Sequence, residues 1–149
     1  MKKIFLIIIL LISHNNFGQN NNLVGKWYGI DENGKPGSIL FDTENFVTFT
    51  SVKNTYGGKE FELKGKFFIY KYNIDYTKNP IQLEYILYKK ESKEGTAIED
   101  NRFKSIVRFI DENTIEIKTS SNSKYPKKFS SKKDKNSIIL KRSLSYDSH

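Results

Sequence analysis

The chain of 149 residues contains no cysteine, and its two histidines, His14 and His149, lie near the start and at the end. Without cysteine there is neither a disulfide framework nor a lipid-modified cysteine anchor. Without a histidine inside the domain, Ser-His-Asp and Cys-His catalytic sites and His-ligated zinc are excluded. The chain also has no P-loop and no dinucleotide-binding fingerprint. The sequence therefore predicts a non-catalytic protein with no cofactor and no metal.

Long apolar runs are also missing, except for residues 4–12, which follow Lys2 and Lys3. Nine apolar residues are too few to span a bilayer, which takes about twenty. The pattern is typical of a helical signal peptide, residues 1–18, cleaved after Gly18. The alternative is a retained membrane anchor. We expect an exported protein, periplasmic or secreted, with no transmembrane segment after processing.

Acidic residues are fewer than basic ones. The predicted mature domain, residues 19–149, has 23 Lys and Arg against 17 Asp and Glu, a net charge of +6. A chain of this length can bury one respectable core. Phe and Tyr are abundant, with eleven and nine in the whole chain, and this aromatic load suits packed β structure.

Short alternating segments, separated by turn residues, run through the mature chain, and amphipathic helical spacing is hard to find. We expect a turn at Gly57-Gly58, a break near Gly65 and a long polar loop over residues 89–102. With no room for crossover helices, the pattern predicts an antiparallel meander that closes, or nearly closes, into a barrel. The expected strands are residues 23–30, 38–41, 46–52, 61–74 as one strand or two, 81–88, 103–110, 114–119 and 137–142.

Three stretches of the chain resemble small secreted bacterial lipocalin-like domains of the calycin group. Residues 23–27 match their opening Gly-x-Trp, and residues 75–83 resemble the Asp-x-x-x-x-Pro segment before an Ile-x-Leu strand. Residues 108–115, 125–129 and 140–142 resemble the closing hairpin, the Arg-Pro-x-x-Phe box and the Leu-x-Arg ending. Most members of these families have no established activity, so the resemblance brings an expected fold without an expected reaction.

The resemblance implies an all-β, antiparallel up-and-down barrel of eight to ten strands. Gly25 and Trp27 would begin its first strand, with Trp27 near the closed end. Arg142 would cover the Trp27 ring by a cation–π contact. Tyr125 stands where the box often has arginine.

Aromatic side chains on the expected strands are candidates for a ligand site inside the barrel. A barrel of eight strands is either filled by its own side chains or holds one small ligand, and the sequence leaves both possibilities open. The resulting hypothesis is a module that binds a small apolar or amphipathic ligand. The candidate residues are Phe49, Phe68, Tyr70, Tyr72, Tyr85 and Phe109, with Glu84 as a polar group.

Glu84 shares a strand face with Ile86 and Tyr88. If that face lines a cavity, the carboxylate needs a polar ligand group or a lysine as its partner. Alternatively, Glu84 faces solvent opposite a lysine on a neighbouring strand. Glu60, Glu62 and Glu84 are weak candidates for acid–base chemistry.

A lysine-rich loop near residues 120–136 offers a second function, an interaction with an anionic partner or envelope surface. A solvated basic loop is the other interpretation. Few aromatics lie nearby and the protein is expected to be exported, so nucleic acid is not an expected partner. The loop's lysines are Lys124, Lys127, Lys128, Lys132, Lys133 and Lys135.

Overall fold

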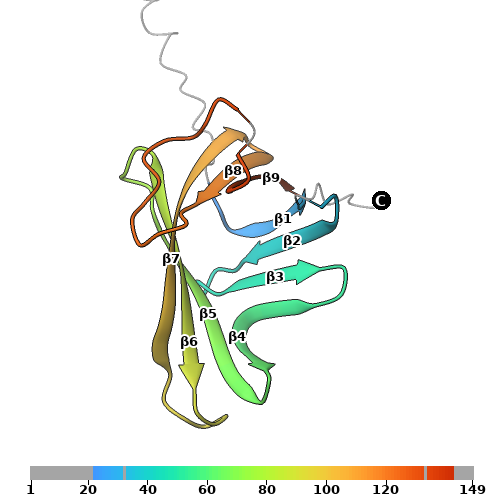
Figure 1. Cartoon of the computed structure of the whole chain (residues 1–149), viewed down its shortest axis with the longest axis vertical. Coiled ribbons are helices and arrows are strands. Elements are labelled where there is room, and N and C mark those ends of the chain that lie inside the picture. The colour runs from blue at the N-terminus through green and yellow to red at the C-terminus, as the bar shows by residue number, and fades with distance from the viewer. Residues whose placement is uncertain (1–21, 32, 133, 143–149) are drawn as a thin grey trace, which may run out of the picture.

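The computed structural model describes residues 22–31, 33–132 and 134–142. The predicted signal peptide and Lys133 lie outside these residues. The described part is all-β, and its nine strands form a closed antiparallel barrel in which each strand pairs with the next and β9 pairs with β1 (Figure 1). The predicted meander and its strand number are therefore confirmed. The strands are β1 Gly25–Ile30, β2 Pro36–Phe41, β3 Val47–Ser51, β4 Thr55–Leu63, β5 Lys66–Asp75, β6 Ile81–Lys90, β7 Ile98–Asp111, β8 Thr114–Thr119 and β9 Ser137–Arg142.

The predicted turn at Gly57-Gly58 is wrong, because β4 continues through both glycines as a bent strand. Before the bend β4 pairs with β3, and after it β4 pairs with β5 across a register shift that follows Gly58. Gly57 has a φ of +116°, and a Cβ atom there would lie 2.2 Å from the Val47 carbonyl oxygen. Only glycine fits this corner, so a glycine pair typical of a turn serves here to redirect a strand.

The long polar loop predicted over residues 89–102 is also shorter than expected. Lys89 and Lys90 belong to β6, and β7 already begins at Ile98. Their backbones pair far toward the tip, with Lys89 opposite Ile98. Backbone pairing along an existing ladder outweighs the low strand propensity of the polar side chains. The predicted break near Gly65 is confirmed, because Lys64 and Gly65 both have positive φ and form the β4–β5 turn.

The barrel interior is packed with apolar side chains around Trp27. Alternation along each strand directs one face inward, and the inward residues of neighbouring strands lie opposite each other. Trp27, Phe41, Leu83 and Ile115 are completely buried in this core. Leu23, just before β1, is buried as well and accepts a 2.7 Å hydrogen bond from the Trp27 indole nitrogen through its carbonyl oxygen.

Arg142 closes the barrel beside Trp27. The two residues lie opposite each other in the β1–β9 pairing, and the guanidinium carbon is 4.4 Å from the centroid of the Trp27 ring. The same guanidinium donates hydrogen bonds to the carbonyl oxygens of Asn22, at 2.6 Å, and Val24, at 3.3 Å. This is the arrangement that the resemblance implied, and it ties the last described strand to the chain segment that precedes the first.

A second, smaller buried region lies outside the barrel. Ile106 alternates with the core residue Val107 on β7, so its side chain faces outward, yet only 1% of it is exposed. The cover is provided by residues 120–136, which connect β8 to β9 across the outside of the sheet (Figure 1) and are called the strap below. The outer face of β6–β8 is therefore partly sealed by the chain itself.

Replacing Gly57 with alanine should destabilise the barrel strongly. The Cβ atom would collide with the backbone of Val47, and the residue would be held at a φ that alanine avoids. We expect a loss of at least about 3 kcal/mol in the free energy of unfolding, measured by urea titration. Gly34→Ala is the matched control, because Gly34 also has positive φ but has nothing within 4 Å of its Cβ position. The control should lose about 1 kcal/mol, and equal losses would contradict the steric argument.

Arg142→Met should weaken the closure of the barrel. The change keeps an apolar stem on Trp27 but removes the cation–π contact and the two hydrogen bonds to carbonyl oxygens. We expect a loss of about 2–3 kcal/mol in the free energy of unfolding. Lys141→Met, one residue earlier and facing outward, should change this free energy by less than about 0.5 kcal/mol. If both variants unfold at the same urea concentration, Arg142 does not stabilise the pairing of β1 with β9.

Candidate functional site

The six aromatic candidates all lie on inward positions of the barrel. Phe49 on β3 contacts the rings of Tyr70 and Tyr85, with centroid distances of 5.2 and 5.5 Å. Tyr72 lies opposite Tyr85 in the β5–β6 pairing, and its ring is 5.0 Å from that of Phe41. Strand periodicity therefore grouped these residues correctly on one face.

The candidates differ in what they can contact. Phe109 packs edge-on against Trp27 at 6.5 Å, and Tyr72 donates a 2.8 Å hydrogen bond to the Asp42 carbonyl oxygen. Both belong to the packed part of the barrel. Phe68 is half-buried and stacks on Phe61 at 5.5 Å. Of the six, Phe49 is the one that lines the hollow described next.

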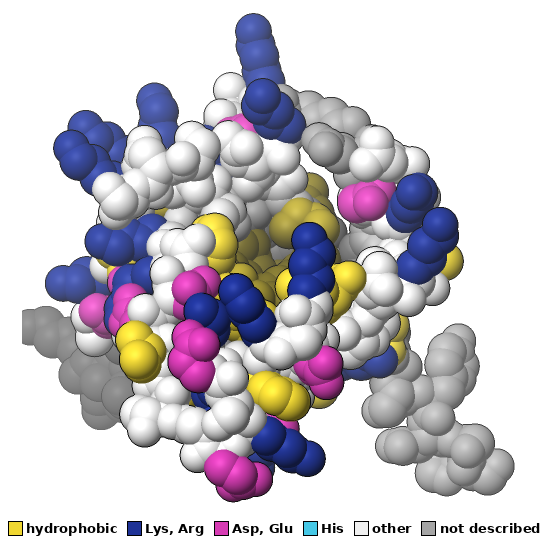
Figure 2. Space-filling view, turned by 60° about the horizontal axis from the view of Figure 1, so that its bottom comes forward, with side chains coloured by type: hydrophobic (Ala, Val, Ile, Leu, Met, Phe, Trp, Pro, Cys, Tyr) yellow, Lys and Arg dark blue, Asp and Glu magenta, His cyan; other side chains and the backbone are white. Residues whose placement is uncertain are grey.

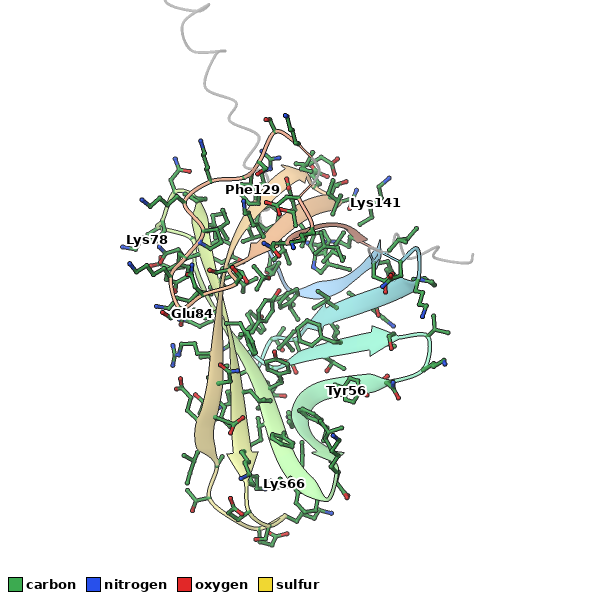
Figure 3. All side chains as sticks on the ribbon, viewed as in Figure 1. Tyr56, Lys66, Lys78, Glu84, Phe129 and Lys141 are labelled. Carbon is green, nitrogen blue, oxygen red and sulfur yellow. The ribbon has the colours of Figure 1, made fainter. Side chains whose placement is uncertain are left out.

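An apolar hollow of about 270 Å³ opens at the barrel end that carries the β1–β2 and β3–β4 hairpins. Its apolar walls come from Ile39, Phe49, Tyr56, Ile138 and Leu140. Figure 2, in which the bottom of Figure 1 comes forward, shows hydrophobic side chains recessed among polar and charged ones. Figure 3 labels Tyr56 on β4, one of the wall residues of the hollow. The barrel is thus filled around Trp27 and has an open hollow at the end that carries these two hairpins.

Small residues keep this end of the barrel open. Gly29 lies opposite Gly37, which lies opposite Ser51, so three neighbouring strands present almost no side chain at one level of the interior. The next inward level on these strands holds Trp27, Ile39 and Phe49, of which Ile39 and Phe49 line the hollow. Sequence reasoning missed this lining. The available signal was Gly29 itself, which stands two residues after Trp27 and so faces the same side of β1.

The hydroxyls of Tyr70 and Tyr85, on the inward face, have no hydrogen-bond partner in the described part of the chain. In that part, the fully buried side-chain polar atoms without a hydrogen-bond partner are Ser137 Oγ and Arg142 Nε, so neither tyrosine oxygen is fully buried. Burial raises the pKa of Tyr70 to about 12 and raises that of Tyr85 further. Both phenols therefore stay protonated at neutral pH and can donate a hydrogen bond.

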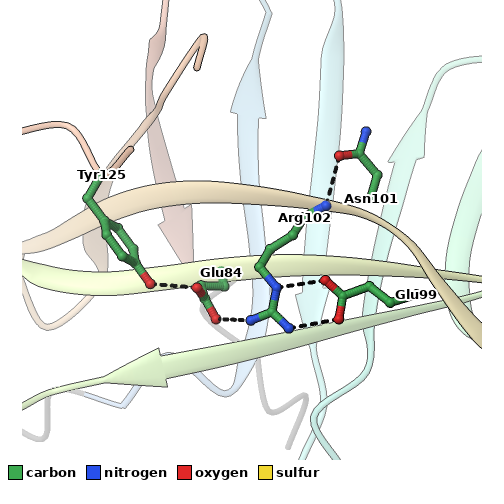
Figure 4. Close-up of polar contacts among 5 residues, drawn as sticks. All are labelled: Glu84, Glu99, Asn101, Arg102 and Tyr125. Carbon is green, nitrogen blue, oxygen red and sulfur yellow. Dashed lines mark hydrogen bonds and ion pairs between the residues drawn. The ribbon is translucent and has the colours of Figure 1, made fainter. Parts of the chain in front are cut away.

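Glu84 does not line the barrel interior. It lies on the outer face of β6 beneath the strap, only 9% exposed, and receives hydrogen bonds of 2.7 Å from both Tyr125 and Arg102 (Figure 4). Lys104 is its cross-strand neighbour, as one alternative supposed, but that ammonium group lies over the Tyr125 ring at 5.0 Å. The polar partners of Glu84 are thus supplied by the protein, and the residue positions the strap.

The other carboxylates named as acid–base candidates are occupied or exposed. Glu60 forms an ion pair with Lys90 at 2.9 Å, and Glu62 is exposed on β4. Among the residues that the structure describes, no group of three or more His, Asp and Glu side chains is arranged to hold a metal ion. Within the same residues, no helix has the length and hydropathy of a membrane span.

The strap lysines divide into two groups. Lys124, Lys127 and Lys128 line a second hollow, of about 360 Å³, whereas Lys132 and Lys135 are exposed without lining it. Lys133 lies outside the described residues. Phe129, the last residue of the stretch that resembles the Arg-Pro-x-x-Phe box, packs under Arg108, whose guanidinium carbon is 4.6 Å from the ring centroid. Figure 3 labels Phe129 on the strap.

Tyr125→Phe should loosen the strap while leaving the ring under Lys104 in place. The lost hydrogen bond reaches a buried carboxylate, so we expect a decrease of about 1.5–3 kcal/mol in the free energy of unfolding near pH 7. Burial, followed by the hydrogen bond to Glu84, raises the pKa of Tyr125 to about 12. Because the folded pKa lies above the ordinary value of 10, this contribution is complete below pH 10 and is lost as the pH rises from 10 to 12.

The measurement is urea unfolding of both proteins from pH 7 to pH 11. The difference between wild type and Tyr125→Phe should shrink above pH 10. Tyr28→Phe is the control, because Tyr28 is 43% exposed and removing its hydroxyl should leave the unfolding free energy nearly unchanged. A gap between wild type and Tyr125→Phe that stays constant with pH would contradict the assignment.

Comparisons of this chain with protein-family models, with curated proteins and with solved structures found no match. The barrel is therefore established by its own strand pairing, and the lipocalin-like resemblance remains a prediction that rests on the motifs quoted above.

Proposed function

We propose that this protein is an exported, non-catalytic lipocalin-like module that binds a small apolar or amphipathic ligand in the open end of its barrel. The observation that carries the proposal is the hollow of about 270 Å³ with walls of aliphatic and aromatic side chains. Ligand sites are commonly concave and mostly apolar, with a few polar groups that set orientation. Export enters the proposal from the predicted signal peptide.

The volume suggests the size of the ligand. Sites for drug-sized molecules enclose about 300–1,000 Å³, so a hollow of about 270 Å³ suits something smaller. A dry apolar cavity of about 150 Å³ is enough for benzene. A bicyclic aromatic or a short alkyl chain fits between these limits.

Polar groups at the edge of the hollow favour an amphipathic ligand. Asp31 and Lys35, from the β1–β2 hairpin, belong to its lining. The Asp31 Oδ1 atom accepts hydrogen bonds from the backbone nitrogens of Asn33 and Lys35, which fixes the carboxylate in the turn. The Lys35 ammonium forms no ion pair among the described residues and is the cationic group of the lining. An apolar body would lie against Phe49 and Ile138, with a polar or anionic end toward Lys35.

Filling the hollow should abolish ligand binding. Ile39→Trp adds an indole to the hollow wall, whereas Leu40→Trp makes the same kind of change on the next residue, which faces outward and is 39% exposed. With 1-naphthol and decanoate as probes in isothermal titration calorimetry, we expect Ile39→Trp to weaken binding at least about tenfold, or about 1.4 kcal/mol. Leu40→Trp should bind like the wild type.

Two outcomes would overturn the proposal. One is a wild-type protein that binds none of 1-naphthol, decanoate and anilinonaphthalene sulfonate. The other is an Ile39→Trp variant, folded by circular dichroism, that binds them as tightly as Leu40→Trp does. Either result would mean that the hollow is not a ligand site.

A further inference from the structure

The strap encloses a hollow on the outside of the barrel, separate from the interior. It has a volume of about 360 Å³ and lies between the end of β8 and residues 120–128 and 136. Its lining is polar and basic, unlike the apolar walls of the interior hollow. The groups that could bind a ligand are Lys124, Lys127, Lys128, Ser121, Asn122 and Asn136.

Four lysines line this hollow, and three of them, Lys124, Lys127 and Lys128, form no ion pair among the described residues. The strap carries six lysines and a single acidic residue, Asp134. Asp134 is occupied by Lys118 on β8, whose ammonium nitrogen lies 2.7 Å from the carboxylate. In the described ranges of the chain, none of the ion pairs includes Lys124, Lys127 or Lys128. Like charges gathered in one concavity repel each other, and an anion would relieve that repulsion.

The strap is anchored, so these lysines project from a supported backbone. Tyr125 is bonded to buried Glu84, and Phe129 packs under Arg108. At its start, the Ser120 backbone nitrogen donates to the Lys104 carbonyl oxygen at 2.8 Å. A site on an anchored segment loses less conformational entropy on binding than one on a free loop.

Hydrogen-bond donors accompany the charges. The Asn122 side-chain oxygen accepts bonds from the Lys124 backbone nitrogen and the Ser120 hydroxyl, which leaves its amide nitrogen to donate. Ser121 adds a hydroxyl to the same lining. Ammonium, amide and hydroxyl donors around one concavity are the chemistry that oxyanions require.

We propose that this hollow binds a phosphate or sulfate group. Three lysines match a group with a charge near −2 better than a singly charged carboxylate, and a phosphate monoester carries about −1.5 to −2 at neutral pH. Lysine binds such groups as a point charge, without the planar geometry that arginine imposes. The proposal is independent of the interior ligand, because the two hollows share no lining residue.

The test compares two triple variants with equal loss of charge. The first is Lys124→Gln, Lys127→Gln and Lys128→Gln. The second, the control, is Lys53→Gln, Lys66→Gln and Lys93→Gln, three exposed lysines without ion pairs in the described structure. The probe is inorganic phosphate, followed by backbone amide NMR shifts of Ser121, Asn122 and Lys124 at constant ionic strength.

We expect saturable shifts in the wild type and the control, and at least a tenfold weaker affinity in the strap variant. A second arm measures co-sedimentation with vesicles that contain phosphatidic acid, whose headgroup is a phosphate monoester, and with vesicles of phosphatidylcholine alone. Saturation by free phosphate supports a soluble oxyanion, and strap-dependent binding to phosphatidic acid alone supports a lipid headgroup. The proposal fails if neither probe binds, or if the control triple weakens binding as much as the strap triple.

Discussion

The closure of the sheet between β1 and β9 is the constraint on which the rest of the barrel depends. This seam is short, with Trp27 opposite Arg142 and Tyr28 opposite Lys141, whereas β6 and β7 pair over most of their length. A short ladder supplies little backbone bonding, so side chains must strengthen it. The Arg142 guanidinium does this by lying on the Trp27 ring and donating to the carbonyl oxygens of Asn22 and Val24. Without closure, the inward aromatic face would lose its opposite wall.

The interior divides according to the size of the inward side chains. Around Trp27, Phe41 and Tyr85, which belong to one buried cluster, the space is filled. Two residues after Trp27 on β1, and two residues before Ile39 on β2, the inward positions are Gly29 and Gly37, which line the hollow. The same sheet geometry therefore yields a packed core at one end and a concave, apolar opening at the other, which is the physical basis for the proposed ligand site.

The strap is joined to the outside of the barrel by a polar cluster around the buried carboxylate of Glu84. Burying the Glu84 carboxylate would be costly in isolation, but Arg102 and Tyr125 supply donors, and Glu99 completes the pairing of Arg102 (Figure 4). This cluster secures Tyr125, and through it the segment that carries the unpaired lysines. An acidic residue that resembled a ligand contact in the sequence thus has a structural role, and it supports a basic surface instead.

The sequence by itself determined the fold class, the shared face of the aromatic candidates on their strands and the lack of cysteine and of histidine between residues 15 and 148. Period-two alternation and turn residues are local properties of the sequence. For this reason the sequence places Phe49, Tyr70 and Tyr85 on one face of the sheet, where their rings are in contact. Tertiary structure alone decided three other features: the bend of β4 at Gly57, the burial of Glu84 beneath the strap, and the two hollows. Each depends on residues that are distant in sequence, such as the Val47 carbonyl beside Gly57 and Tyr125 above Glu84. Local patterns carry no information about which distant group fills or leaves open the adjoining space.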